Sequence, residues 1–547
     1  MRFPAYILLL IILLCSSCAE DPDENIDSRT VFRYNESAGI SSLDPSFARN
    51  VENIWAINQL FNGLVQMDDE LNIIPSIASS WDISEDGMVY TFHLRSDVYF
   101  HDHELFPEGE GRKVIAEDFV HSLFRIVNPE VTSPGAWIFN NLDKSKDLGF
   151  KALDDSTFQI YLKQPFPPFL GLLTTQYCSV IPHEIVEHYG RDFRNHPVGT
   201  GPFKFKMWKE GVQLIFVKND NYFEKTPEGE SLPYLDAVSI SFLSEKQVVF
   251  LEFVKGDLDF ISGLDEMPID EVLSHTGELN PKYEGKFILE SRPYLKTDYL
   301  GILVDKESAL VKASPLSNKL VRQAMNYGID RVKMITYLRK NVGTAAHAGI
   351  IPRGMPSYDT SIVKGYKYDP DKAKELLIEA GYGGSVKMPS IEISTSSDYL
   401  DMCEFIQHQL GEIGFNITID VKAAVTLREL VATSRIVLFR KNWLADYPDA
   451  ENYLALFYSK NFAPIGPNYT HFKNDEYDAL YETAQLETDD TARYKIYQQM
   501  DQLIIDEAPI VPLYYDQSIR LIQNNISGLK SNPMNLLNLK KVRKLSQ

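Results

Sequence analysis

Cysteine is scarce in this sequence, because only four occur in 547 residues and two of them lie within the first 18. The other two, Cys178 and Cys403, are far apart in the chain, so a framework of disulfide bonds is excluded by the count alone. One bond between them stays open, since spacing does not decide it. Cys403 falls in an apolar helical pattern, which favours a buried free thiol.

Positive charge is also in deficit, with 54 lysine and arginine residues against 76 aspartate and glutamate residues and a formal net charge of -22. Nucleic-acid binding needs a basic face that neutralises phosphates, so this balance argues against such a partner. Hydrophobic residues make up 44% and charged residues 24%, which is ordinary for a globular protein. The length predicts two or three domains.

The N-terminal apolar run is too short to span a membrane. Residues 6–14 give nine apolar positions after Arg2, and the small residues that follow end at Cys18. This arrangement resembles the lipobox of bacterial lipoproteins, although Cys15 stands where the pattern prefers leucine; an ordinary secretory signal is the alternative. We predict a signal peptide over residues 1–17 and an acidic, flexible, lipid-anchored tether over residues 18–30.

Motifs of catalysis are not found. The sequence lacks G-x-S-x-G, H-E-x-x-H and the phosphate loop G-x-x-x-x-G-K-[ST]. Residues 199–202 (GTGP) lack the third glycine of a dinucleotide fingerprint, and their proline has no amide for a phosphate. Residues 101–104 (HDHE) invite a metal interpretation, but such clusters are common on surfaces. We expect no enzymatic activity, no cofactor and no metal site.

What the sequence does contain is a regular succession of strand and helix patterns. Residues 31–34 read as a strand, and Asp86-Gly87 as a turn between two strands, the second of which buries Tyr90, Phe92 and Leu94. Asp369 is placed to cap a helix that ends at Gly381. Further helices are predicted from apolar spacing at residues 51–61, 320–325 and 494–504. This alternation predicts an α/β protein with mixed sheets.

One stretch, residues 442–454 (NWLADYPDAENYL), has the character of a ligand site. It follows an apolar run at residues 436–439, which we predict to be a buried parallel strand, and ligands of open α/β sheets bind beyond the carboxyl ends of strands. Asp446 lies between aromatic residues, where a desolvated carboxylate needs a partner such as a ligand ammonium. The alternative is that Asp446 or Asp449 caps the helix that follows.

Several long segments, in order, resemble the family 5 extracellular solute-binding proteins, the peptide- and nickel-type receptors of bacterial ABC importers. The most specific is residues 81–102, W-x-I-S-E-D-G-x-x-Y-T-F-x-L-R-x-D-V-x-F-x-D. The similarity continues through these segments: residues 42–66, 116–122, 198–223, 317–331, 368–382 and 442–454. It covers nearly all of residues 31–521. After residue 102 this chain has a longer acidic loop than the family.

The resemblance implies a two-lobed periplasmic-binding-protein fold of type II, similar to cluster C, with three discontinuous domains that close over the ligand like a hinge. Domain I is expected to hold residues 31–61, 198–285 and 512–547. Domain II is expected over residues 62–197, and domain III over residues 286–511.

The resemblance also assigns roles near Asp446. Trp443, Ala445, Asp446 and Tyr447 match the W-x-A-D-Y stretch whose aspartate, in oligopeptide receptors, pairs with the free α-ammonium of the peptide. Asp446 inherits this role. Arg440 stands where some oligopeptide receptors have an arginine that meets a peptide carboxylate, but it fits a surface or lobe–lobe salt bridge equally well.

Two further segments are assigned in the same way. Arg49, Asn50 and Val51 occupy the place where family members pair with the ligand main chain as an extra strand, which gives broad specificity. Peptide binders can carry an aromatic residue where this chain has Gly135, and Trp137 is expected to substitute for it.

The resemblance therefore implies a peptide receptor of an ABC importer: a monomer, exported to the periplasmic face of the envelope, held at the lipid bilayer by an acyl group on Cys18. The permease and the ATPase would be separate chains. Two alternatives remain. One is a receptor for a nickel chelate, an oligosaccharide or an opine-like compound, and the other is a sensor or hydrolase on the same fold. Asp446 favours an amine-bearing ligand over a neutral sugar.

Overall fold

The computed structural model describes residues 30–263, 267–383 and 386–545. The predicted signal peptide, Cys18 and nearly all of the tether lie outside the described residues. Within the described part of the chain, no helix has the length and apolar character needed to cross a membrane.

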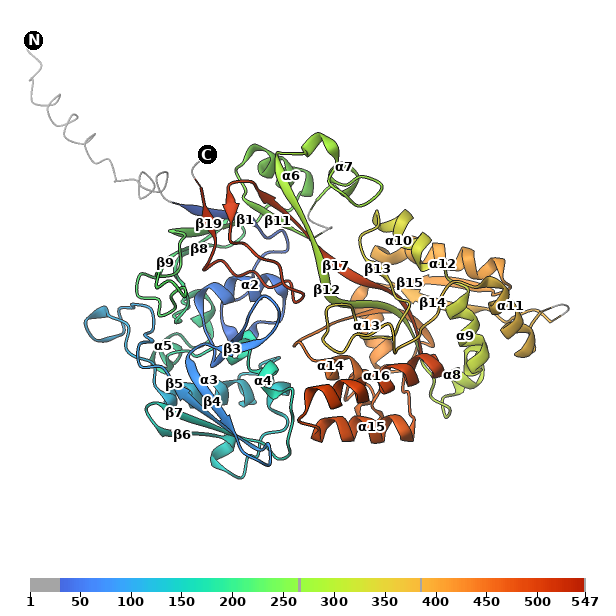
Figure 1. The fold of residues 1–547 in the computed structure, drawn as a ribbon, viewed down its shortest axis with the longest axis horizontal. Helices are drawn as coiled ribbons and strands as arrows, with labels where there is room; N and C mark the ends of the chain where they lie inside the picture. The colour runs from blue at the N-terminus through green and yellow to red at the C-terminus, as the bar shows by residue number, and fades with distance from the viewer. Residues whose placement is uncertain (1–29, 264–266, 384–385, 546–547) are drawn as a thin grey trace, which may run out of the picture.

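Two long strands run through the middle of the molecule. β12 (Phe287–Ile302) and β17 (Ile510–Gln523) pair antiparallel and pass between two bodies, one coloured blue to green and the other yellow to orange (Figure 1). The red C-terminal segment follows β17 back to the first body (Figure 1). Both bodies are therefore tied to one strand pair, which is the arrangement that a two-lobed receptor requires.

The large sheet extends on both sides of this pair in the order β15-β14-β16-β12-β17-β11-β1-β10-β9-β8, with β13 (Thr344–Ala345) paired to β17. β1 pairs parallel with β10 and β11, whereas β12 and β17 pair antiparallel with their neighbours, so the sheet is mixed as predicted. Its other strands are β1 (Val31–Asn35), β8 (Phe203–Lys209), β9 (Gln213–Lys218), β10 (Ala237–Ser241), β11 (Phe260–Ser262), β14 (Ile391–Thr395), β15 (Ile417–Val421) and β16 (Leu438–Leu444).

A second sheet of four antiparallel strands lies in the first body, in the order β4-β5-β7-β6. The predicted turn at Gly87 is confirmed, with φ of 68°, and Tyr90, Phe92 and Leu94 are buried as expected. Its strands are β4 (Ala78–Ile83), β5 (Val89–Leu94), β6 (Phe150–Asp154) and β7 (Thr157–Tyr161). Two small pairs complete the strands: β2 (Val65–Met67) with β3 (Ile73–Pro75), and β18 (Ile526–Ser527) with β19 (Arg543–Lys544).

The predicted helices are confirmed. Asp369 caps α11 by accepting a hydrogen bond from the Lys372 amide at 2.9 Å, and Gly381 has a positive φ of 91° just beyond the helix end. The helices are α2 (Val51–Leu60), α3 (Ala116–Val127), α4 (Phe169–Leu172), α5 (His183–Tyr189), α6 (Lys246–Lys255), α7 (Ile269–Val272), α8 (Ala309–Lys312), α9 (Lys319–Tyr327), α10 (Arg331–Arg339), α11 (Pro370–Glu379), α12 (Leu400–Glu412), α13 (Ala424–Ala432), α14 (Glu451–Leu454), α15 (Asp475–Leu486) and α16 (Asp490–Glu507).

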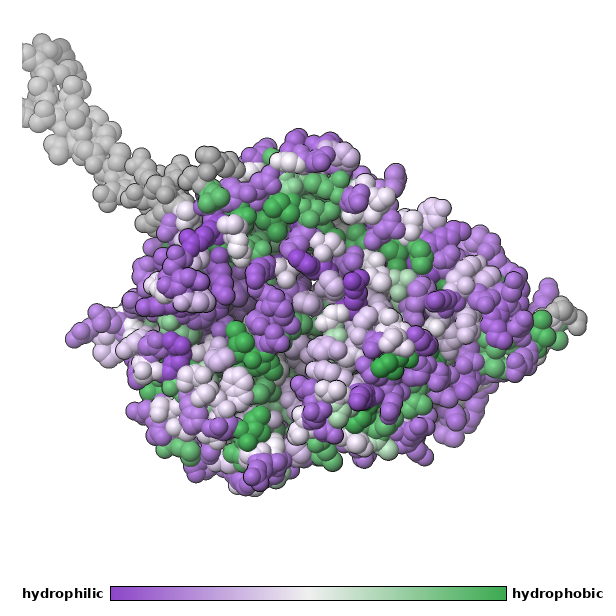
Figure 2. All heavy atoms as spheres, viewed as in Figure 1, coloured by the Kyte–Doolittle hydropathy of each residue, from purple (hydrophilic) through white to green (hydrophobic). Residues whose placement is uncertain are grey.

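Each body has its own hydrophobic core. Cys178 is buried in the largest cluster, in the first body, and Cys403 is buried in a cluster under α12 in the second. Both are free thiols, which confirms the prediction for Cys403 and answers the question of pairing. The face in Figure 2 is largely hydrophilic, with hydrophobic residues gathered around α6, where Leu251 is exposed. The domain boundaries stay a prediction.

One strand differs from its prediction. The apolar run at residues 436–439 was expected to end a parallel strand, but β16 continues to Leu444. Leu438 and Phe439 pair parallel with β14, while all of β16 pairs antiparallel with β12. Main-chain hydrogen bonds to β12 keep the polar residues of β16 in the strand, and a search for apolar runs does not detect such residues. Asp446 therefore lies two residues beyond the carboxyl end of a strand, closer than the sequence indicated.

Candidate functional site

A cavity of about 520 Å³ brings together five of the predicted site residues, and we call it the binding cavity. Arg49, Val51, Trp137, Ala445 and Asp446 all line it. They come from the start of α2, from the 3-10 helix Ala136–Phe139 and from the chain just after β16. Segments separated by about 400 residues thus converge on one hollow, which is how a ligand site between two bodies is built.

The C-terminal segment forms another wall of the binding cavity, which no sequence pattern had indicated. Met534 and Leu536 line the cavity on either side of Asn535. The Trp55 ring nitrogen donates a hydrogen bond to the Asn535 carbonyl at 2.8 Å, which fixes this segment against α2.

Asp446 is an exposed residue that lines the binding cavity, and the described residues place no counter-charge beside its carboxylate. Its oxygen accepts a hydrogen bond from the Asn452 amide at 3.2 Å, and the Asn452 carbonyl in turn accepts from the Trp443 ring nitrogen at 2.8 Å. Among the described residues, no lysine, arginine or histidine lies within 4.0 Å of the Asp446 carboxylate. Desolvation by the surrounding cavity walls raises the pKa of Asp446 above its usual value, and the Asn452 hydrogen bond offsets part of that rise.

The residue that caps the following helix is Asp449 rather than Asp446. Its carboxylate accepts the Glu451 amide at 2.8 Å, at the first residue of α14, and lies 3.4 Å from the Arg493 guanidinium. Asp449 is therefore a structural residue that is neutralised within the protein. Asp446, three residues earlier, is left facing the cavity.

Tyr177 is a wall residue that sequence reasoning missed. A Cβ atom on Gly135 would lie 2.5 Å from the Tyr177 ring, so the glycine is what allows this ring to lie there. Burial, together with the nearby charge of Asp446, raises the pKa of Tyr177 to about 12. The signal that could have revealed Tyr177 was the glycine at position 135, where family peptide binders can carry an aromatic residue. In this chain the ring of Tyr177 lies against that glycine and lines the cavity instead. Trp137, which was expected to substitute, lines the same cavity and is 38% exposed.

Trp443 and Tyr447 face a neighbouring hollow of about 680 Å³, which we call the side cavity. Asp446 and Trp137 line both cavities, so they mark the border between them. Asn50 is exposed at the residue before α2 and lines neither cavity. The Arg49 amide donates a hydrogen bond to the Phe47 carbonyl at 2.7 Å, so it is already paired within the protein rather than free for a ligand main chain. Pairing of residues 49–51 with a ligand main chain stays a prediction.

Arg440 is engaged within the protein. Its guanidinium pairs with Asp298 of β12 and lies 3.1 Å from the centre of the Tyr399 ring. Burial lowers the pKa of Arg440 to about 10. This salt bridge is buried between neighbouring strands, so it is not the surface or lobe–lobe pair that was expected, and contact with a peptide carboxylate stays a prediction.

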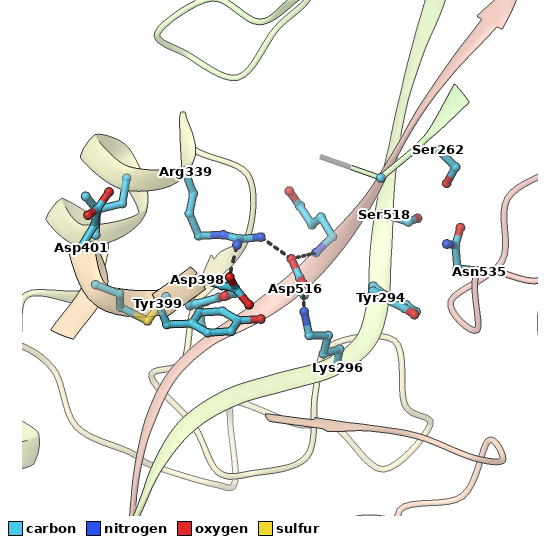
Figure 3. A pocket seen from close by; sticks show the side chains of 15 residues that line it. Ser262, Tyr294, Lys296, Arg339, Asp398, Tyr399, Asp401, Asp516, Ser518 and Asn535 are labelled. Atoms are coloured by element: carbon cyan, nitrogen blue, oxygen red, sulfur yellow. Dashed lines mark hydrogen bonds and ion pairs between the residues drawn. The ribbon is translucent and has the colours of Figure 1, made fainter. Parts of the chain in front are cut away.

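A third hollow of about 740 Å³, the polar cavity, is lined by Lys296, which lies 3.6 Å from Asp298, and by Tyr399, whose ring Arg440 covers. Its central carboxylate, Asp516, stands between Lys296 and Arg339, with nitrogen–oxygen distances of 2.8 and 2.5 Å (Figure 3). Burial alone would raise the pKa of Asp516, but Arg339 and Lys296 hold it below its usual value. The charge of Asp516 is therefore compensated by the protein itself.

The histidines that invited a metal interpretation are arranged differently. His101 is buried, and its ring nitrogen lies 3.0 Å from the Gly201 carbonyl oxygen. Burial lowers its pKa to about 4. In the part of the chain that the structure describes, no three histidine, cysteine, aspartate or glutamate residues are placed to hold a metal ion.

Comparison with known proteins adds the wider context. The model of bacterial extracellular solute-binding proteins, family 5 Middle, matches residues 72–464. Glutathione-binding protein GsiB of Salmonella typhi is 26% identical over 497 residues, 90% of each chain. Heme-binding protein A of Haemophilus influenzae is 28% identical over 494 residues, 87% of this chain and 85% of that protein.

Solved structures agree with the fold. The periplasmic binding protein DppA of Helicobacter pylori, in complex with the peptide STSA, is 27% identical with a TM-score of 0.75, covering 95% of this chain and 99% of that one. HbpA2 of Haemophilus parasuis has a TM-score of 0.79 at 22% identity, covering 94% and 99%. These likenesses confirm the predicted two-lobed periplasmic-binding-protein fold with mixed sheets.

Proposed function

The chain belongs to family 5 of the bacterial extracellular solute-binding proteins, and from this membership we propose that it captures peptides by their free amino end at Asp446. The cargo passes to a permease and an ATPase on separate chains. Closure of the two bodies about β12 and β17 would enclose the ligand, as in other hinged binding proteins.

The observation that carries this proposal is the uncompensated charge of Asp446. The Asp446 carboxylate lines the cavity, is partly desolvated by its walls and lacks a cation within the described residues, and closure over a ligand would make that charge costly unless something neutralises it. A peptide ammonium would do so through a short charge-assisted hydrogen bond. Asn452 already holds one carboxylate oxygen in place, so the acceptor is oriented before the ligand arrives. The structural likeness to a receptor with bound peptide supports the same choice of ligand.

The other walls suit the remainder of a peptide. Val51 opens α2 and brings helix amide groups to the edge of the cavity, while Trp137 and Tyr177 offer aromatic faces to side chains. Ala445 is small enough to let a main chain approach closely. Contacts of this kind read little of the side-chain sequence, so we infer broad specificity for peptides.

We also propose that residues 1–17 are removed on export and that Cys18 carries the lipid. The mature protein would then be a monomer held at the periplasmic face of the envelope by an acyl anchor in the bilayer. Cys18→Ser would release the protein from the membrane fraction and abolish labelling by radioactive palmitate. Unchanged membrane association would contradict the anchor.

The experiment that tests the peptide proposal compares matched tetrapeptides with free and N-acetylated amino ends by isothermal titration calorimetry. A peptide amidated at its carboxyl end serves as the control for a change of charge elsewhere. Acetylation should weaken binding at least about 30-fold, because it removes a cation from a buried pair worth roughly 2–5 kcal/mol. Equal affinity for the two forms would contradict the assignment of Asp446.

A further inference from the structure

The side cavity holds a buried carboxylate, Glu451, which the proposed function leaves unused. Glu451 is the first residue of α14 and only 6% exposed. Its two oxygens accept hydrogen bonds from two tyrosines, Tyr447 on one oxygen and Tyr481 on the other. A carboxylate oxygen has two lone pairs, so one acceptor position remains free on each oxygen.

Glu451, like Asp446, has no cation beside it. Within the described residues, no lysine, arginine or histidine lies within 4.0 Å of its carboxylate, although Asp449, two residues away, is paired with Arg493. The one basic residue in the lining of the side cavity is Lys163, whose side chain is exposed. Two tyrosine hydroxyls satisfy part of the hydrogen-bonding capacity of Glu451 but none of its charge.

We propose that Glu451 is a cation subsite that takes the basic side chain of the ligand's first residue while Asp446 takes its α-ammonium. This inference rests on the proposed function and names the ligands that the site prefers: peptides that begin with lysine, arginine or ornithine. The two carboxylates would then be neutralised by two cations on one ligand residue.

The position of Asp446 supports this arrangement. Because Asp446 lines both cavities, an ammonium bound to it places the first Cα at their border. The main chain then continues along α2 in the binding cavity, and the first side chain turns into the side cavity.

The walls of the side cavity match a long basic side chain. Trp137 and Tyr447 lie along the route, with ring centroids 6.3 Å apart, and Glu451 lies in the same lining. A lysine or arginine stem packs against aromatic faces while its charged end reaches a carboxylate. The cavity volume of about 680 Å³ leaves ample room for such a side chain. Burial also raises the pKa of Glu451 to about 6, so a bound cation would favour its ionised form.

The test uses two tripeptides with free amino ends that differ only in the first residue, lysine or the uncharged norleucine. Calorimetry at pH 7.5 with the wild type should show the lysine peptide binding at least about tenfold more tightly. In Glu451→Gln, whose amide oxygen still accepts a tyrosine hydroxyl, this preference should fall to about onefold. Glu404→Gln, an exposed residue of α12, makes the same charge change far from the cavity and should keep the preference.

Equal binding of both peptides by the wild type, or an unchanged preference in Glu451→Gln, would overturn the subsite while leaving the peptide proposal intact. Failure of both peptides to bind would overturn the peptide proposal itself. If Glu451→Gln does not fold, the wild type can be tested with an Nε-acetyl-lysine peptide, which removes the charge from the ligand instead. Retention of full affinity by that peptide would overturn the subsite.

Discussion

The polar cavity and the binding cavity contain the same kind of residue in opposite electrostatic states. In the polar cavity, Asp516 is buried between Lys296 and Arg339. In the side cavity Glu451 is buried, and in the binding cavity Asp446 is an exposed lining residue; neither has a cation within 4.0 Å among the described residues. The difference teaches that burial of a carboxylate does not itself mark a ligand site. The mark is a cavity-lining carboxylate whose charge the protein leaves uncompensated.

The two states have opposite energetic consequences. Breaking a buried ion pair by removing one partner costs roughly 3–5 kcal/mol, because the other charge is left unpaired. A carboxylate that is desolvated without a cationic partner already carries part of this cost in the unliganded protein, and a ligand cation relieves it. Neutralising a carboxylate that is paired within the protein should therefore destabilise the fold. Neutralising a carboxylate that has no cationic partner should instead weaken ligand binding.

The largest expected effect comes from breaking the pairs of the polar cavity. Asp516→Asn removes the carboxylate that joins Lys296 of β12 and Arg339 of α10 to β17. Lys296 keeps a longer contact with Asp298 at 3.6 Å. We expect the free energy of unfolding without ligand to fall by roughly 3–5 kcal/mol in urea denaturation. Asp446→Asn, the matched change in the binding cavity, should leave it unchanged or slightly higher. Equal losses in both variants would end the distinction between the two cavities.

The next effect is on affinity. Asp446→Asn removes the charge that meets the ligand ammonium but keeps the shape of the side chain. Binding of a free-amine peptide should weaken by roughly 2–5 kcal/mol, which is about 30- to 5,000-fold. Calorimetry measures it, with Glu404→Gln as the control for net charge. A change of less than threefold would show that the ammonium binds elsewhere.

A smaller effect is the pH dependence of stability, which should differ between Glu451, which has no cationic partner, and Asp516, which is paired. Burial raises the pKa of Glu451 to about 6, above its ordinary value of about 4.5. Ionisation of Glu451 therefore lowers the free energy of unfolding as pH rises from about 4.5 to about 6, and this stability returns as pH falls through the same range. The pKa of Asp516 is lowered, so its contribution is present above about pH 4 and is lost only as pH falls further.

Glu451→Gln should therefore be more stable than the wild type above pH 6, by at most about 2 kcal/mol, and this advantage should shrink towards pH 4.5. Urea denaturation of the unliganded proteins across this range measures the difference. Asp449, Tyr447 and Tyr481 surround the carboxylate in both proteins, and their contributions cancel in the comparison. An advantage that stays constant with pH would contradict the raised pKa.

The smallest effect concerns the wall of the binding cavity. Gly135→Ala places a Cβ atom 2.5 Å from the Tyr177 ring, so the ring must move. We expect peptide affinity to fall about threefold, or roughly 0.6 kcal/mol. Gly411→Ala is the matched control, because nothing lies within 4 Å of its Cβ position in α12; it should stabilise the helix by about 1 kcal/mol without changing affinity. Unchanged affinity in Gly135→Ala would remove Tyr177 from the site.

The features that were predictable from sequence are local ones. Asp369 caps its helix through an amide three residues away, and the Gly87 turn needs only its own backbone. Asp446 was predicted because its aromatic neighbours adjoin it in the chain and match the family stretch. Such features need no knowledge of how distant segments pack.

The features that escaped prediction depend on distant pairing. Tyr177 reaches the site by packing against Gly135, and the C-terminal residues around Asn535 arrive through their contact with Trp55. Arg440 pairs with Asp298, which is 142 residues away in the neighbouring strand. Which carboxylates are compensated is therefore decided by the strand order of the sheet, and a hydrophobic pattern does not contain that order.

The measurement that tests the central claim most directly is a thermodynamic cycle between Asp446 and the ligand ammonium. Free and N-acetylated copies of one peptide are titrated into the wild type and into Asp446→Asn. We predict that the advantage of the free amine, at least about 30-fold in the wild type, falls to about onefold in the variant, because the two changes remove the same interaction. An advantage of the free amine that persists undiminished in Asp446→Asn would contradict the claim.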